Sequence, residues 1–190
     1  VGCGYGGLCL AINYFQKSIK IDQFFKESYY WLGKSLVSLN KWFEAIHYFK
    51  KAYKLNNENV DYIKSLAFAE FKVGNMVSSI DLYNRALEID PTDYKTSLDY
   101  SFIYYESGDI EKAIKIIKDS IEEVPGESLL YYRLVIYLMD SGRYKESINV
   151  LESALSLNFD NHEVLFDFVP NFETQSALIR VINQYRKNEL

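Results

Sequence analysis

Apolar and small residues recur along this chain with a period of 34 residues. Isoleucine keeps this spacing from one end of the sequence to the other, at Ile12, Ile46, Ile80, Ile114, Ile148 and Ile182. A small residue stands directly before each of the four interior isoleucines, at Ala45, Ser79, Ala113 and Ser147. A period of this length is typical of stacked repeats, in which each repeat buries its apolar face against its neighbours. The pattern therefore predicts a solenoid rather than a closed globular domain.

Each repeat divides into two amphipathic helical segments. In residues 26–59 the apolar and small residues follow helical spacing in both halves, at Tyr29, Leu32, Gly33 and Leu36, then at Trp42, Ala45, Ile46, Phe49 and Ala52. Between the halves stand Asn40, Gly74, Gly108 and Gly142, where we expect a left-handed backbone. Pro91 and Pro125 mark links between repeats, and we expect Thr92 to cap the following helix.

The period places four full repeats at residues 26–59, 60–93, 94–127 and 128–161, within one solenoid domain. Residues 1–25 are expected to be a truncated repeat with its second helix at about 10–20, because each glycine in residues 1–9 costs a helix about 1 kcal/mol relative to alanine. Residues 162–190 are expected to form a degenerate capping repeat. Its first helix should end at Pro170 and Asn171, and residues 172–188 carry one apolar stripe with a polar back.

Residues 26–59 resemble the tetratricopeptide repeat (TPR), a helix-turn-helix unit of 34 residues. The later repeats depart from the pattern in places: Glu70 stands where tyrosine or leucine is usual, and Asn57 and Phe159 replace the proline kept by Pro91 and Pro125. The resemblance implies an all-α fold, a right-handed superhelical α-solenoid of antiparallel helix pairs, with about four full repeats and partial repeats at both ends. It also implies that the first helices line a concave face that binds peptides or partner helices.

Carried over by repeat phase, the family's concave face gives a predicted peptide groove. Its residues are Tyr30, Lys34, Lys64, Phe68, Phe71, Phe102, Tyr105, Tyr132, Ile136 and Met139. Many of these residue types are enriched at interface hot spots, and a contiguous apolar patch often marks a binding site. Packing between neighbouring first helices would bury the same side chains, so each is a candidate for either role. Phe68, Tyr105 and Met139 are the best candidates for contact with a partner.

One known groove chemistry is not expected. Repeat proteins that hold the carboxylate tail of a chaperone resemble one another in a lysine and asparagines on successive first helices. Lys64 fits one of these positions, but Phe68 and Asp99 stand where asparagines would be needed. A groove this apolar favours a hydrophobic or amphipathic segment of a protein partner.

Composition narrows the function further. The formal charge of -5 and a pI near 5.2 lack the basic footprint of a nucleic-acid-binding protein. No apolar run approaches the ~18 residues of a membrane span, so none is expected. Cys3 and Cys9 are the only cysteines, and neither His47 nor His162 is near them, so we expect no metal site. The cysteine usage suits a reducing compartment, which favours a cytoplasmic location.

No catalytic motif is present: the sequence has no phosphate-binding glycine loop on a strand, no nucleophile elbow and no metal-binding histidine pair. The sequence therefore predicts a noncatalytic protein-protein interaction scaffold without a cofactor. Two alternatives stay open: a self-associating structural module that forms a homo-oligomer, and a regulatory segment of a larger protein.

Overall fold

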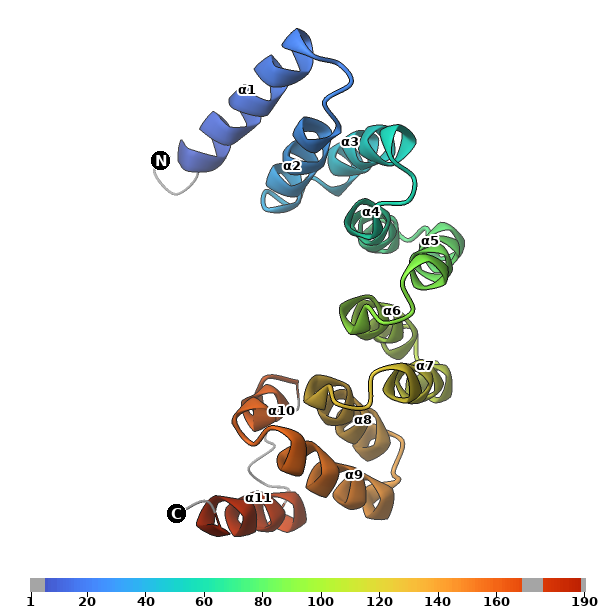
Figure 1. The fold of residues 1–190 in the computed structure, drawn as a ribbon, viewed down its shortest axis with the longest axis vertical. Helices are drawn as coiled ribbons and strands as arrows, with labels where there is room; N and C mark the ends of the chain where they lie inside the picture. The colour runs from blue at the N-terminus through green and yellow to red at the C-terminus, as the bar shows by residue number, and fades with distance from the viewer. Residues whose placement is uncertain (1–5, 169–175, 189–190) are drawn as a thin grey trace. The chain divides into compact units, whose positions relative to one another are not determined.

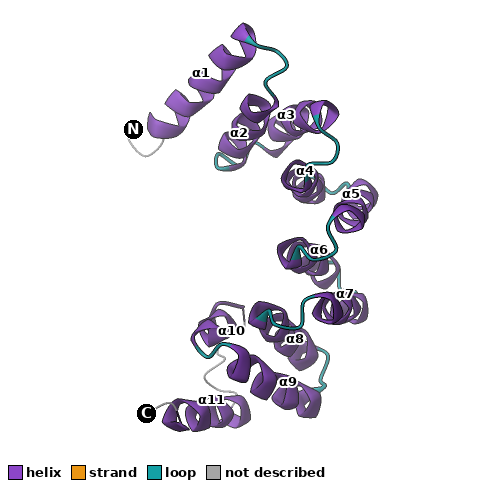
Figure 2. Cartoon of the chain, in the orientation of Figure 1, coloured by secondary structure: helices purple, strands orange, loops and turns teal. Residues whose placement is uncertain are grey.

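The computed structural model describes residues 6–168 and 176–188, and in these ranges every regular element is a helix (Figures 1 and 2). The predicted all-α fold of stacked antiparallel helix pairs is confirmed. The chain divides after Asp90 into two compact units, residues 1–90 (unit 1) and residues 91–190 (unit 2), each of which is described by itself.

Unit 1 consists of five helices that pack in chain order. They are α1 (Gly6–Ile21), α2 (Lys26–Val37), α3 (Trp42–Leu55), α4 (Val60–Lys72) and α5 (Met76–Ile89). The pairs α2/α3 and α4/α5 are the first and second helices of successive repeats, and α2 and α4 lie on one side of the unit with α3 and α5 on the other (Figure 1). Helix α1 is longer than the predicted segment of residues 10–20: it begins at Gly6, includes Gly7 and ends at Ile21.

The core of unit 1 forms where small residues let two helices approach. One cluster of its buried residues consists of Leu32, Leu36, Ala45, Ile46, Phe49, Leu66 and Ala69. At the crossing of α2 and α3, a Cβ atom added to Gly33 would lie 2.5 Å from Cε1 of the Phe49 ring. Any larger residue at position 33 would push the two helices apart or displace a ring that is 1% exposed.

The turns inside the repeats follow the sequence prediction. Asn40 has φ 57°, and Gly74, Gly108 and Gly142 have φ 86°, 86° and 77°. Glycine reaches this left-handed region without a steric penalty, and asparagine tolerates it better than most residues. The prediction that Thr92 caps the next helix was wrong, because the N-cap is Asp93, whose carboxylate accepts a hydrogen bond from the Lys95 N–H.

Unit 2 continues the same pattern. Its elements are α6 (Tyr94–Glu106), α7 (Ile110–Glu123), α8 (Ser128–Asp140), α9 (Tyr144–Leu157), the 3-10 turn η1 (Asp160–Glu163), α10 (Val164–Phe168) and α11 (Ser176–Asn188). The short α10 packs against α8, and α11 packs against α9. From the apolar stripe expected in the capping repeat, Leu178, Val181 and Ile182 are buried. Pro170, Asn171 and Phe172 lie outside the described residues.

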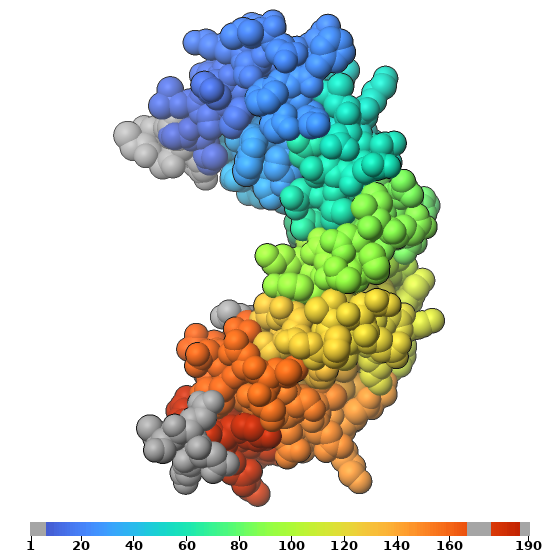
Figure 3. All heavy atoms as spheres, viewed as in Figure 1, coloured from blue at the N-terminus to red at the C-terminus, as the bar shows by residue number. Residues whose placement is uncertain are grey.

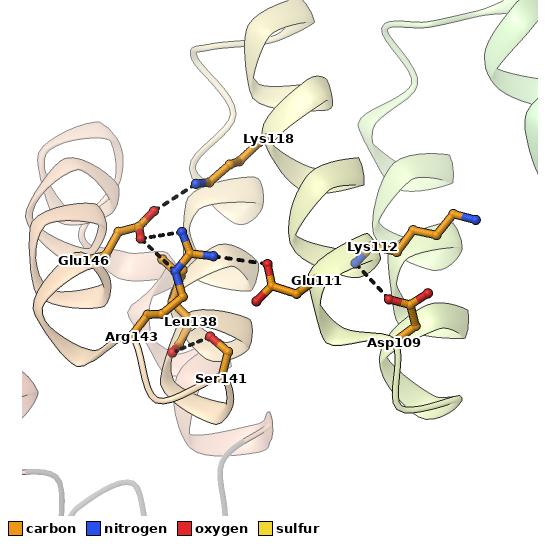
Figure 4. Close-up of polar contacts among 8 residues, drawn as sticks. All are labelled: Asp109, Glu111, Lys112, Lys118, Leu138, Ser141, Arg143 and Glu146. Carbon is orange, nitrogen blue, oxygen red and sulfur yellow. Dashed lines mark hydrogen bonds and ion pairs between the residues drawn. The ribbon is translucent and has the colours of Figure 1, made fainter.

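A charged network joins α7 to α9 in unit 2 (Figure 4). Arg143 donates to the Glu146 carboxylate through Nε at 2.9 Å and Nη2 at 2.6 Å, and its Nη1 lies 3.4 Å from Glu111 Oε2. Lys118 Nζ reaches the other oxygen of Glu146 at 2.8 Å. Glu146 is therefore held by Lys118 of α7 and by Arg143, the N-cap residue of α9, which fixes the N-terminal turn of α9 against α7.

Candidate functional site

The first helices of unit 1 carry an aromatic face, which we define as Tyr30, Phe68 and Phe71. All three side chains are half-buried. Tyr30 on α2 packs against Tyr62 on α4, with ring centres 4.9 Å apart. This contact joins the two first helices through their rings; Tyr62 is buried, whereas Tyr30 is half-buried.

Phe68 and Phe71 form the α4 part of the aromatic face. Their ring centres are 6.3 Å apart, and the Trp42 ring meets Phe68 edge-on at 5.9 Å. Lys72 Nζ lies 5.1 Å from the Phe68 ring centre and 5.7 Å from that of Phe71. These are cation–π distances, so the ammonium group is held beside both rings. The result is an apolar surface with a fixed positive charge at its edge.

The two predicted groove lysines of unit 1 differ in their surroundings. Lys34 on α2 is exposed. The Lys64 side chain is 20% exposed and its Nζ lies 3.1 Å from Asp61 Oδ1 one turn earlier on α4. A partner carboxylate would therefore meet Lys34 in water, but it would compete with Asp61 for Lys64.

In unit 2 the predicted groove residues on α6 are half-buried. Tyr105 stacks on Tyr137 of α8, with ring centres 4.8 Å apart and 22° between the planes. The Tyr105 hydroxyl donates a short hydrogen bond to the Asp140 carboxylate. This bond, assisted by burial, raises the pKa of Tyr105 to about 12. Phe102 is half-buried on the same helix.

The predicted groove residues on α8 lie inside unit 2. Tyr132, Ile136 and Met139 are 0%, 1% and 4% exposed, and the Tyr132 hydroxyl donates to the Asn158 carbonyl at 2.8 Å. The cause is that α8 is surrounded, with α6, α7, α9, η1 and α10 all packed against it. The structure therefore does not place these three side chains, including the favoured Met139, on the surface. Sequence analysis had left packing open as their alternative role.

Large exposed apolar side chains occur at positions that sequence analysis did not single out. On α1 and the following connection they include Leu10, Tyr14, Ile21, Phe24 and Phe25, and elsewhere in unit 1 they include Trp31, Phe43 and Val77. The 34-residue period marks positions that are buried in every repeat, so it gives no signal for which of the other side chains are exposed.

Within the described part of the chain, no group of three or more histidine, cysteine, aspartate or glutamate side chains is placed to hold a metal ion. Among the same residues, no helix combines the length and apolar character needed to cross a membrane.

Comparison with known protein families identifies the family of the chain. Tetratricopeptide-repeat profiles match residues 26–59, 70–135 and 129–161. The chain belongs to the tetratricopeptide repeat family. The match at residues 26–59 falls on the same segment that carries the motif best in the sequence.

Among curated relatives, this TPR chain is 26% identical over 157 residues to protein O-mannosyl-transferase TMTC3 of Homo sapiens, covering 80% of this chain and 17% of that protein. It is 23% identical over 155 residues to the BBSome complex member BBS4 of Bos taurus, covering 82% of this chain and 30% of that protein. The chain therefore spans less than a third of the length of these relatives.

Two solved structures share the fold. The crystal structure of MamA has a TM-score of 0.68 at 22% identity and covers 80% of this chain and 89% of MamA. YrrB, described as a TPR protein with an unusual peptide-binding site, has a TM-score of 0.60 at 13% identity, with 91% and 92% covered. At these identities the likeness concerns the fold of stacked TPR helix pairs.

Proposed function

We propose that this TPR chain is a noncatalytic protein-interaction module, and that the aromatic face of unit 1 binds a peptide segment or an amphipathic helix of a protein partner. The observation that carries the proposal is the placement of Tyr30, Phe68 and Phe71. The three side chains are half-buried on the first helices, and each ring packs against another aromatic ring: Tyr30 against Tyr62, and Phe68 against Phe71. Rings held this way lose little conformational entropy on binding.

Each residue of the face has a distinct role in this proposal. Phe68 and Phe71 supply the apolar anchor surface, and Trp42 holds the Phe68 ring in place from α3. Lys72, fixed beside both rings, attracts a carboxylate or backbone carbonyl of the ligand. Lys34 adds a second positive charge on α2, which is exposed to solvent. A bound segment with one or two large apolar side chains followed by an acidic residue satisfies all of these groups.

We also propose that Phe102 and Tyr105 on α6 of unit 2 form a further surface for contact with a protein partner. The stacking of Tyr105 on Tyr137 and its bond to Asp140 make it a rigid contact residue. Tyr132, Ile136 and Met139 support α8 from within and affect binding only through its position. Absence of catalysis is part of the proposal, since the first-helix surfaces present rings and lysines. The transferase named among the relatives is a protein of which this chain spans 17%.

A peptide-display selection on the immobilised chain tests this function. We expect the selected peptides to carry large apolar residues beside an acidic one. Their affinity, measured by fluorescence anisotropy, should fall at least tenfold in Phe68→Asp, because a charge there opposes burial of the anchor and repels the acidic residue. Phe71→Asp should behave alike, so one variant suffices if the other alters folding.

Phe43→Asp is the matched control, because it replaces an aromatic residue by the same charge at a side chain that is 77% exposed on α3. It should bind the selected peptides as the unmodified chain does. The assignment of the face is wrong if Phe68→Asp and Phe71→Asp keep full affinity while circular dichroism shows both to be folded.

A further inference from the structure

The connection between α1 and α2, residues 22–25, carries two exposed phenylalanines at the surface of unit 1 (Figures 1 and 3). We call it the α1–α2 link. Phe24 is 70% exposed and Phe25 is 48% exposed, and Ile21 at the end of α1 is 88% exposed. The positions equivalent to Phe24 in the later links are also exposed, and they hold Glu58, Thr92, Gly126 and Asp160. Exposure is therefore a property of this position in every repeat, and a large apolar side chain there is the exception.

Phe25 stands where the later first helices have a polar cap. Directly before α4, α6 and α8, a side-chain oxygen of Asn59, Asp93 or Glu127 accepts a hydrogen bond from the backbone of the helix. Phe25 makes no such bond at the start of α2. Because a polar N-cap stabilises a helix, the phenylalanine lowers the stability of α2 while it adds exposed apolar surface. A local conflict of this kind is typical of a functional site.

The backbone of the α1–α2 link is nevertheless regular. Asp22 Oδ1 accepts a hydrogen bond from the Phe24 N–H at 2.8 Å, and the Tyr29 hydroxyl donates to the Gln23 carbonyl at 3.1 Å. The corresponding bonds of later links join Asn56 with Glu58 and Tyr131 with Pro125. The two phenylalanines are thus displayed on an ordered backbone, so little backbone entropy is lost when they enter another apolar medium.

Exposed lysines border the α1–α2 link. Helices α1 and α3 are successive second helices, and their C-terminal halves contain no acidic residue. The lysines in these halves, all exposed, are Lys17, Lys20, Lys51 and Lys54. Their equivalents in α7 and α9 of unit 2 are Asp119, Glu122, Ser153 and Ser156. The links that follow α1 and α3 add the exposed acids Asp22 and Glu58, so positive charges outnumber negative ones around the phenylalanines.

From these observations we propose that the α1–α2 link is a peripheral membrane contact for an anionic lipid bilayer. Phe24, Phe25 and Ile21 enter the interface between headgroups and acyl chains, and the lysines of α1 and α3 bind the anionic headgroups. Apolar side chains bordered by lysines are the combination that holds a segment at a bilayer surface. A protein would need a pocket shaped for these side chains, whereas a fluid bilayer deforms around them. The contact uses no residue of the aromatic face and goes beyond the function proposed for that face.

Co-sedimentation of the full chain with vesicles of phosphatidylcholine and phosphatidylserine in equal parts tests this contact. We expect saturable binding that is about tenfold weaker to phosphatidylcholine alone, because the headgroup charge is then missing. Phe24→Ser should weaken binding about tenfold, because its ring no longer leaves water, and Lys17→Gln with Lys20→Gln should have an effect of about the same size. Phe25→Asn should weaken binding but raise the unfolding midpoint in urea, because it supplies the missing cap.

Phe43→Ser is the matched control, since Phe43 is 77% exposed in the first turn of α3, whereas Lys54 lies in the last turn. It should bind vesicles as the unmodified chain does. The proposal fails if the chain does not sediment with the anionic vesicles, or if Phe24→Ser and the unmodified chain bind them equally. It also fails if the peptides selected on the chain lose affinity in Phe24→Ser while vesicles are not bound, because the link then belongs to a protein interface. A dimer that Phe24→Ser dissociates would likewise assign the link to contact with a second copy.

Discussion

At the scale of single residues, Glu70 departs most from the repeat. Its equivalents in the other repeats are Leu36, Tyr104 and Leu138, yet Glu70 is 1% exposed at the same core position. Lys50 Nζ lies 2.7 Å from one carboxylate oxygen, and the Asn75 side-chain amide donates to the other at 2.6 Å. The carboxylate is thus compensated, but the cost of removing it from water remains.

We predict that Glu70→Leu leaves the free energy of unfolding unchanged or raises it by about 1–4 kcal/mol, the range for buried ion pairs replaced by apolar residues, because the Lys50 side chain left behind is 59% exposed and stays hydrated. Lys50→Met should lower it, because the buried carboxylate then loses its cation. Urea unfolding of both variants measures these changes. A clear loss of stability in Glu70→Leu would mean that the ion pair contributes more than its desolvation costs.

At the scale of helices and their contacts, the 34-residue period was sufficient to predict the helix pairs and their left-handed turns. It could do so because most buried positions in α2 to α9 recur at the same place in each repeat, with Glu70 as an exception. The irregular elements were less predictable. Helix α1 extends through two glycines despite their low helix propensity, and the segment after Phe159 begins as a 3-10 turn before α10.

The network between α7 and α9 gives a pH prediction. The hydrogen bond from Lys118, aided by Arg143, holds the pKa of the Glu146 carboxyl below its ordinary value of 4.5. The unfolded chain therefore binds this proton more readily than the folded one. The stabilisation is present above about pH 4.5 and is lost as the pH falls through the lowered pKa.

We expect unfolding midpoints in urea to fall more between pH 7 and pH 3 for the unmodified chain than for Glu146→Gln. The corresponding difference in the free energy of unfolding should be about 0.5 kcal/mol, because the Glu146 side chain is 37% exposed and its ion pairs are screened by water. Glu152→Gln, an exposed change on the same helix, serves as the control and should follow the unmodified chain. Equal pH dependence in all three proteins would show that the network does not contribute to the stability of the folded chain.

At the scale of the whole molecule, sequence periodicity identifies the first helices but not which of their side chains reach the surface. Phe68 and Met139 illustrate the difference. Both were favoured for contact, yet Phe68 is half-buried and Met139 is 4% exposed. The environment of Met139 depends on the helices gathered around α8, including the irregular η1 and α10, whose packing the 34-residue period does not encode.

The two units differ in their tryptophan content, so fluorescence can test whether a destabilising substitution in one unit also destabilises the other. Both tryptophans, Trp31 and Trp42, belong to unit 1, whereas Ile114 of the isoleucine series is 3% exposed in unit 2. Repeats contact only their neighbours, so stability is nearly a sum of local terms. Ile114→Asp buries an unpaired carboxylate and should cost about 3 kcal/mol or more.

We therefore expect Ile114→Asp to lower the thermal midpoint seen by circular dichroism, which reports all helices, much more than the midpoint seen by tryptophan fluorescence, which reports unit 1. Tyr144→Asp, at a side chain 59% exposed in unit 2, should move neither signal appreciably. An equal shift of both signals in Ile114→Asp would show that the repeats unfold as one cooperative block. An unaltered melting curve would instead contradict the repeat register, because position 114 would then tolerate a charge that a buried position cannot.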